Sequence, residues 1–306
     1  MQATLKTAFT VNGVGLHSGR AVRMTVSPAA AGTGIWFKRS DRVEGDAYIP
    51  ARWDMVERSR LCTLIKNADG VSVSTIEHIM AALAGCGIHN ALVEVSGPEV
   101  PIVDGSAAPF VAAILKAGVQ HLDVPVRAIR VLKTVEVTEG DAVARIAPAF
   151  SLSIDFEIDF ADAAIGRQSR CLNMANGAFV RELCDSRTFC RKSDVDAMQA
   201  AGLALGGSLR NAVVVDGASV LSPGGFRHPD EPVRHKMLDA LGDLALAGAP
   251  LLGAYTGYKA GHALTNRLLH ALFADPTNTQ IVSCGPSTVR NLPGVGVRIA
   301  DLRAVA

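Results

Sequence analysis

The chain has 306 residues, of which 49% are hydrophobic and 19% are charged. This length and composition suit one large or two medium folded domains and exclude a disordered or fibrous protein. The 30 basic and 29 acidic side chains leave a net charge of +1. Because nucleic acids and anionic membranes attract an excess of basic residues, we expect neither as a partner, and no stable membrane insertion.

The six cysteines do not form any Cys-x-x-Cys pair, so a cysteine-zinc knuckle is not expected. The first residues do not show the basic-then-apolar pattern of a signal peptide. We therefore expect free thiols and a cytoplasmic protein. The longest apolar stretch, 241–258, contains Asp243, Pro250 and several glycines, and predicts a buried helix, a turn and a strand.

The first part of the chain alternates turn signals with short apolar segments. A glycine-rich turn at 11–20 leads into a strand at 21–26, and a second strand is predicted at 35–37. A helix is predicted over 74–84, because its apolar residues recur with helical spacing and Gly85 follows. A strand at 90–95 and a helix at 109–117 complete this part.

A domain boundary is predicted near residue 124, just before Pro125, because strand patterns begin again after it. The alternating segments 130–137 and 152–158 predict strands. The further predicted elements are helices at 176–184, 193–201, 232–247 and 262–273, and a strand near residue 280. Strands and helices do not alternate regularly, which favours an α+β fold over a doubly wound sheet.

His235 and Asp239 are the most informative pair, because residues four apart on a helix share one face about 6 Å apart along the axis. An imidazole and a carboxylate so placed can bind one zinc ion, with His78 as a third ligand. Three protein ligands leave one position for water, as in catalytic zinc sites. Glu77, beside a ligand, is then the candidate base.

Each of these features also has a simpler interpretation. A His-x-x-x-Asp pair on a helix is more often a solvated pair than half of a metal site. The segment 74–77 fits the Ser-x-x-Glu capping box that begins a helix, which would give Glu77 a structural role. Spacing alone does not decide between these interpretations.

Other polar residues gain meaning only beside such a site. Asp243 continues the face of His235 and Asp239, and is a candidate to orient His262, which begins the last predicted helix. Charged His262 could stabilise an oxyanion or protonate a leaving amine. Thr188 could hold the oxyanion, and Lys236 and Lys259 could neutralise a diphosphate. His17, between two glycine turns, is either a packing residue or a ligand contact.

Six motifs together resemble the UDP-3-O-acyl-N-acetylglucosamine deacetylases, the zinc amidases of lipid A biosynthesis. In chain order they are GVGLHSG at 13–19, STIEH at 74–78, PIVDGSA at 101–107, SRTF at 186–189, RHKMLDALGD at 234–243 and GHAL at 261–264. Each motif alone is weak, but the set occurs in family order over nearly the whole chain. The resemblance favours the three-ligand zinc interpretation over the solvated pair.

The resemblance implies two similar domains, 1–124 and 125–306, each a two-layer helix-on-sheet sandwich, with the active site at their interface. It implies that a metal ion is bound by His78, His235 and Asp239, and that Glu77 is the general base. It also assigns Thr188 to the oxyanion and His262, with Asp243, to electrostatic stabilisation or acid catalysis.

The resemblance further implies an acylated UDP-sugar as the small-molecule substrate. The substrate contacts that follow from it are Lys236, Phe160, Phe189, His17 and Lys259. An insert near 191–208 would form a hydrophobic passage for the acyl chain. We expect a monomer. Two histidines and a carboxylate suit ferrous iron as well as zinc.

Two rival functions stay open at this stage. One is a zinc amidohydrolase that acts on another acylated sugar, and the other is a catalytically silent nucleotide-sugar-binding protein. Activity on N-acetyl substrates that lack UDP or the acyl chain would favour the first, whereas absence of turnover would favour the second.

Overall fold

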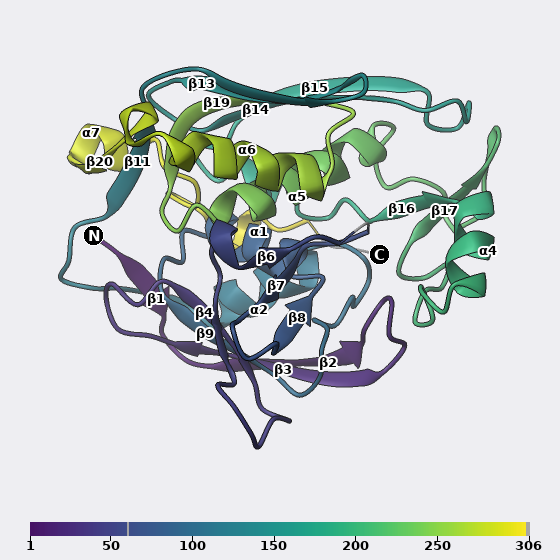
Figure 1. The fold of residues 1–306 in the computed structure, drawn as a ribbon, viewed down its shortest axis with the longest axis horizontal. Helices are drawn as coiled ribbons and strands as arrows, with labels where there is room; N and C mark the ends of the chain where they lie inside the picture. The colour runs from purple at the N-terminus through teal and green to yellow at the C-terminus, as the bar shows by residue number, and fades with distance from the viewer. Residues whose placement is uncertain (60, 304–306) are drawn as a thin grey trace.

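The computed structural model describes residues 1–59 and 61–303 and has an α+β fold in four layers. A sheet from the second half of the chain lies at the top of Figure 1, and helices α5 and α6 lie beneath it. Helices α1 and α2 follow, and a sheet from the first half forms the bottom layer. The fold is therefore two helix-on-sheet units whose helical layers face each other.

The sheet of the first half has five strands in the order β2-β3-β9-β4-β5, with β4 and β9 parallel and the other pairs antiparallel. Alternating burial along β3 turns Val22, Met24 and Val26 toward the helices. The strands of this half are β1 (Ala3–Leu5), β2 (Phe9–Val14), β3 (Ala21–Pro28), β4 (Ile35–Arg39), β5 (Tyr48–Pro50), β6 (Val56–Glu57), β7 (Leu64–Lys66), β8 (Ser72–Ser74), β9 (Ala91–Val95) and β10 (Val119–His121). Its helices are α1 (Glu77–Gly85) and α2 (Ala108–Ala117), with the short 3-10 helix η1 (Trp53–Met55).

The second half is built around β19, which pairs with β11, β13 and β14. Its strands are β11 (Arg127–Val131), β12 (Val135–Glu139), β13 (Ala142–Pro148), β14 (Ser153–Asp159), β15 (Arg167–Asn173), β16 (Phe189–Arg191), β17 (Val213–Asp216), β18 (Ser219–Val220), β19 (Leu251–Tyr258) and β20 (Thr279–Ser283). Its helices are α3 (Ala178–Glu182), α4 (Lys192–Ala200), α5 (Glu231–Ala245), α6 (His262–Ala274) and α7 (Pro286–Val289), with 3-10 helices η2 (Pro276–Asn278) and η3 (Ile299–Asp301). The segment β16-α4-β17 projects at the right of Figure 1.

The two halves share one hydrophobic core, in which α1 packs against α5. The two helices approach closely at Gly242, where a Cβ atom would collide with the backbone carbonyl of Glu77. Any larger residue at 242 would push the helices apart. This contact brings the first turn of α1 next to the middle of α5.

Most predicted elements are confirmed, including the helices that begin at His262 and cover 232–245. Three expectations are wrong. The segment 11–20 is not a turn throughout, because β2 extends to Val14 and pairs with β3. The segment 130–137 is not one strand, because β11 ends at Val131 and β12 begins at Val135. The 74–77 capping box does not form, because Ser74 belongs to β8 and its hydroxyl donates to Pro98 instead.

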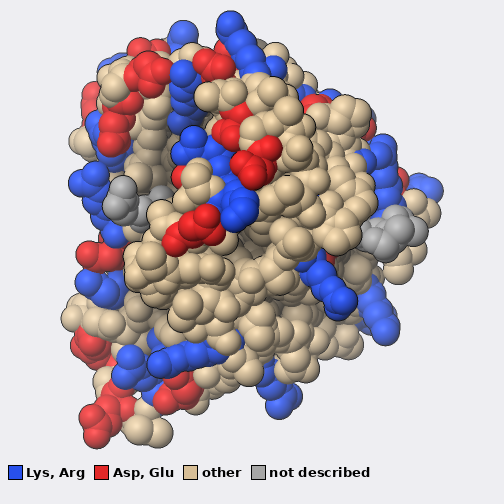
Figure 2. Space-filling model, turned by 90° about the vertical axis from the view of Figure 1, so that its right-hand side faces the viewer, with Lys and Arg blue, Asp and Glu red and all other residues tan. Residues whose placement is uncertain are grey.

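The state of the cysteines, the polarity of the helices and the mixed surface charge match what the composition predicts. All six cysteines are free. In the described residues, the helices are all too short or too polar to cross a membrane. On the face drawn in Figure 2, basic and acidic side chains lie interspersed in the upper centre and along the left side.

Candidate metal centre

Helices α1 and α5 place His78, His235 and Asp239 at one point between the two halves. Each of the three offers a ligand atom, these atoms lie within 4.8 Å of one another, and all three residues are buried. Asp239 Oδ1 lies 3.3 Å from His235 Nε2 and 3.7 Å from His78 Nε2. The helical spacing expected for His235 and Asp239 is present.

Two observations show that these side chains fit a metal ion. Asp239 Oδ1 is buried and has no hydrogen-bond partner among the described residues, although buried polar atoms are normally paired. His235 Nδ1 donates to the backbone carbonyl of Ser186 at 3.0 Å, so the lone pair of Nε2 faces the other two ligands. An orienting bond of this kind is typical of metal-binding histidines.

The protonation states also suit a cation. Burial lowers the pKa of His235 to about 4, which keeps its imidazole neutral and able to bind a metal. Burial alone would raise the pKa of Asp239, but His235 and Lys236 outweigh it and hold that pKa well below its usual range. Lys236 Nζ lies 3.0 Å from Asp239 Oδ2. Two imidazoles and a carboxylate suit zinc and ferrous iron alike.

Glu77 lies beside this cluster without belonging to it. One of its oxygens, Oε2, accepts a hydrogen bond from the backbone N–H of Thr63 at 3.0 Å. The other, Oε1, lies 3.9 Å from His262 Nε2. Burial raises the pKa of Glu77, and His262 and His78 oppose that rise. A carboxylate with a raised pKa beside a metal cluster is well placed to exchange protons.

His262 and Asp243 form a buried pair next to Glu77 and Asp239. His262 Nδ1 and Asp243 Oδ2 are 2.8 Å apart, so Nε2 faces Glu77 and Asp239. Burial lowers the pKa of His262, but Asp243 and Glu77 outweigh it and raise the pKa to about 9. The imidazole is therefore charged at neutral pH.

Thr188 and Phe189 closely follow Ser186, whose carbonyl orients His235, and Phe160 packs against Phe189. The ring of Phe189 lies edge-on to that of His235, with centroids 6.3 Å apart, and to that of Phe160 at 5.5 Å. Thr188 is anchored through its backbone, which donates to Gly105 and accepts from Val213. The Thr188 hydroxyl has no hydrogen-bond partner within the described part of the chain.

Lys259 and His17 are not brought to the cluster by any contact of the described residues. Lys259 Nζ pairs with Asp141 at 2.8 Å and with Asp159 at 3.3 Å, at an edge of the upper sheet. The backbone N–H of His17 donates to Glu99, and the carbonyl of His17 accepts from Leu205. The sequence motif around His17 therefore seats a loop against the 191–208 segment.

The 191–208 segment comprises the end of β16, helix α4 and a loop that packs on residues 15–19. Gly206 lies so close to the carbonyl of Gly15 that a side chain would not fit. Val195 and Met198 are half-buried, whereas Leu203 and Leu205 are exposed by 38% and 59%. Apolar side chains thus remain accessible on this segment.

Two residues that the sequence did not single out hold the site together. Thr63 donates through its backbone to Glu77 and through its hydroxyl to Asp243. Glu99 is buried and accepts from the backbone of His17 and Ser18 and from the hydroxyl of Thr75. The contacts of Thr63 and Glu99 are long-range, so spacing along the chain offers no signal for them.

Comparison with known proteins places the chain in a family. Residues 2–274 match the family model described as UDP-3-O-acyl N-acetylglycosamine deacetylase. A protein from Phenylobacterium zucineum named UDP-3-O-acyl-N-acetylglucosamine deacetylase is 50% identical over 90% of this chain and 94% of its own length. Proteins of the same name from an Anaeromyxobacter species and Myxococcus xanthus are 48% and 46% identical, over 92% and 98% of this chain and 91% and 94% of their own. The chain belongs to the UDP-3-O-acyl N-acetylglycosamine deacetylase family.

Proposed function

We propose that this chain hydrolyses the N-acetyl group of UDP-3-O-(3-hydroxyacyl)-N-acetylglucosamine, a committed step of lipid A biosynthesis. The products are acetate and the free 2-amine. The observation that carries the proposal is the convergence of His78, His235 and Asp239 beside Glu77, whose Oε1 accepts no hydrogen bond from the described residues. The names of the relatives supply the substrate.

The metal is proposed to be zinc, held by His78, His235 and Asp239, with ferrous iron as the alternative in the cell. A divalent ion at this site supplies a Lewis acid for the amide carbonyl and lowers the pKa of a water molecule to about 7. The orphaned oxygen of Asp239 and the oriented imidazole of His235 support this assignment.

Glu77 is proposed to take the proton of the attacking water, because its Oε1 faces the cluster while Thr63 fixes the other oxygen. A bond forms between the water oxygen and the acetyl carbon, and the bond from that carbon to nitrogen breaks. The proton passes to the departing amine. Charged His262, held by Asp243, and the hydroxyl of Thr188 are proposed to stabilise the negative oxygen that develops.

Substrate contacts are proposed for Lys236, Phe160, Phe189, His17 and Lys259. Lys236 is supported by its place beside Asp239, and Phe189 and Phe160 by their place beside His235. His17 is supported only through its contact with the 191–208 segment, which we propose as the passage for the acyl chain. Lys259 has the weakest support, because Asp141 and Asp159 already neutralise it.

We further propose that the domains divide between residues 124 and 125, and that the protein acts as a cytoplasmic monomer. The division is supported by the strands, since the lower sheet ends at β9 and the upper sheet begins at β11. The near-neutral charge supports a small-molecule partner rather than a polyanion.

The test is release of acetate from UDP-3-O-(3-hydroxyacyl)-N-acetylglucosamine by the purified protein. We expect turnover that a chelator abolishes and that zinc restores. Equal turnover of N-acetylglucosamine without UDP or acyl chain would favour a broader zinc amidohydrolase. Tight binding of the substrate without acetate release would favour a silent binding protein.

A further inference from the structure

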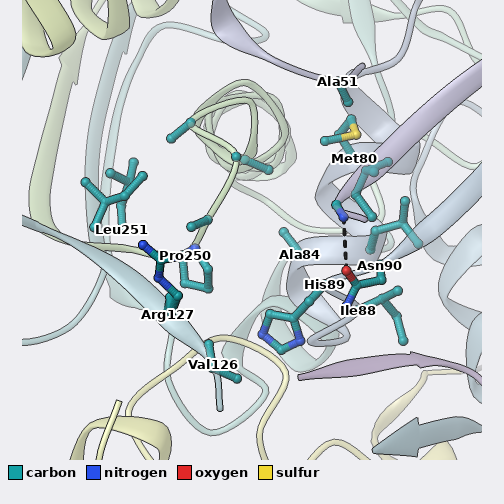
Figure 3. Close-up of a pocket in the computed structure, with 18 of the residues that line it drawn as sticks. Ala51, Met80, Ala84, Ile88, His89, Asn90, Val126, Arg127, Pro250 and Leu251 are labelled. Atoms are coloured by element: carbon teal, nitrogen blue, oxygen red, sulfur yellow. Dashed lines mark hydrogen bonds between the residues drawn. The ribbon is translucent and has the colours of Figure 1, made fainter. Parts of the chain in front are cut away.

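A cavity of about 540 Å³ is lined by residues of α1 and α5 other than the candidate metal ligands. Figure 3 shows Met80, Ala84 and Ile88 on one side and Val126, Pro250 and Leu251 on the other. The first set belongs to the first half of the chain and the second set to the second half. The volume lies within the range of roughly 300–1,000 Å³ that is typical of small-molecule sites.

The walls of this cavity are mostly aliphatic. Helix α1 contributes Met80 and Leu83, and helix α5 contributes Leu241 and Leu244. The apolar lining that remains partly accessible to water includes Ile35, Ala84 and Pro250, so a ligand that replaced water against these side chains would gain hydrophobic free energy. An aliphatic chain therefore suits the walls.

The polar groups at the rim select an anion. None of the described residues that line the cavity is an aspartate or a glutamate. Arg127 is exposed at the start of β11 and, within the described part of the chain, has no ion-pair partner. Arg52, by contrast, is already paired with Asp54.

His89 supplies a second donor. Its Nδ1 accepts a hydrogen bond from the backbone N–H of Ala3 at 3.0 Å, so in the neutral ring the proton is on Nε2. The side chain of the neighbouring Asn90 already donates to Gln2 and accepts from Gly34. Arg127 and His89 are thus the donors left for a ligand, and both favour an acceptor with negative charge.

We propose that this cavity binds a single aliphatic carboxylate, with its chain between α1 and α5 and its head group at Arg127. The site is separate from the proposed acyl passage at 191–208 and does not depend on the proposed function. The bound aliphatic chain would contact α1 and α5, which are the same two helices that carry the candidate metal ligands.

The test uses decanoate below its micellar concentration, with decanol and acetate as probes that lack the charge or the chain. Labelled methionine methyl groups report the location, because Met80 lines this cavity and Met198 lies on the 191–208 segment. We expect decanoate to shift the Met80 resonance, to bind at least about tenfold more tightly than decanol, and to gain about fourfold in affinity per added methylene from hexanoate upward.

Two variants and one control complete the experiment. We expect Arg127→Gln to remove the preference for decanoate over decanol, and Ala84→Leu, which fills the cavity, to weaken both ligands. Arg145→Gln, on an exposed strand residue outside the cavity, should behave as the wild type. Melting temperature and acetate release show that each variant is folded.

Three results would overturn the proposal. They are a shift of Met198 without one of Met80, equal affinity for decanol and decanoate in the wild type, and undiminished binding in Ala84→Leu. If the wild-type protein released no acetate, the proposed function would be contradicted. The proposal of a carboxylate site would not be affected, because the methionine signals do not require turnover.

Discussion

The hydroxyl of Thr63 donates a hydrogen bond to Oδ1 of Asp243 across 2.5 Å. This bond links the loop that precedes β7 to helix α5. Both residues are buried. The other oxygen of Asp243 pairs with His262, while the backbone N–H of Thr63 binds Glu77. One threonine therefore fixes both the proposed base and the partner of the proposed cationic histidine.

Replacing Thr63 with valine should be costly because it leaves a buried carboxylate oxygen without its donor. We expect Thr63→Val to lower the free energy of unfolding by about 1–3 kcal/mol, measured by denaturant titration. Thr63→Ser keeps the hydroxyl and is the matched control. Equal stability of the valine and serine variants would show that this hydrogen bond contributes nothing.

His235→Ala should remove a proposed metal ligand and abolish turnover while the protein stays folded. Metal content by elemental analysis, together with circular dichroism, measures both effects. His228→Ala serves as a comparison, because His228 is also buried but pairs with Asp185 rather than with the cluster. Full metal occupancy in His235→Ala with normal activity would contradict the ligand assignment.

Glu77→Gln tests the proposed base with little change of shape. We expect the variant to retain its metal and to lose roughly 10²–10⁴-fold in kcat, the usual contribution of a general base. The amide can still accept from the Thr63 N–H, so the melting temperature should change little. A variant with normal kcat and a strongly reduced melting temperature would make Glu77 a structural residue.

The proposed acyl passage predicts selectivity for the acylated substrate. Each buried methylene of the acyl chain would contribute about 0.8 kcal/mol, part of which can position the acetamide. We expect UDP-N-acetylglucosamine without the 3-O-acyl group to be poorer by several orders of magnitude in kcat/KM. Comparable turnover of both sugar nucleotides would contradict the assignment of an acyl passage to the 191–208 segment.

His89 should make stability fall in mild acid. Burial, with smaller contributions from the amino terminus and His121, lowers its pKa to about 4, below the ordinary 6.5. Between these values the unfolded chain binds a proton that the folded protein does not, so stability decreases as the pH falls from about 6.5 to 4 and the effect ends below that. The ring is half-buried, so we expect a loss of about 2 kcal/mol.

His89→Asn keeps an acceptor for the Ala3 N–H but cannot be protonated, and should flatten this pH dependence. Unfolding by urea at several pH values between 4 and 7 measures the slope. His121→Asn removes one of the smaller contributions to the pKa shift of His89 and should therefore reduce the slope only slightly. An unchanged slope in His89→Asn would exclude His89 as the titrating group.

Local patterns in the sequence predicted the elements that carry the candidate site. His235 and Asp239 share a helix, so their spacing alone placed them on one face, and His262 begins a helix as expected. Thr63 could not be found this way, because Asp243 is 180 residues away and only the folded chain joins them. The sequence suggests Lys259 as a diphosphate contact only because lysines commonly bind phosphates. Its actual partners, Asp141 and Asp159, are brought to it by the pairing of strands.

The capping box expected at 74–77 also shows that a local sequence pattern does not reveal tertiary hydrogen bonds. Serine is a residue type that often begins a helix, but the hydroxyl of Ser74 donates to the carbonyl of Pro98 instead. The next residue, Thr75, adopts a left-handed backbone conformation at φ +58°. Glu99, which is remote in sequence, stabilises that conformation by accepting from the Thr75 hydroxyl. Tertiary hydrogen bonds therefore replaced the local cap, and Glu77 was left free to face the cluster.

The close approach of α1 and α5 at Gly242 has a consequence for how the halves of the chain stay together. His78 lies on one helix and His235 and Asp239 on the other, so an ion held by all three would act as a clasp across the crossing. Ligand binding favours the state that binds, and here that state is the one in which the two halves are docked. Loading with metal would therefore slow the opening of the crossing, and hydrogen exchange of the α1 and α5 amides would report it.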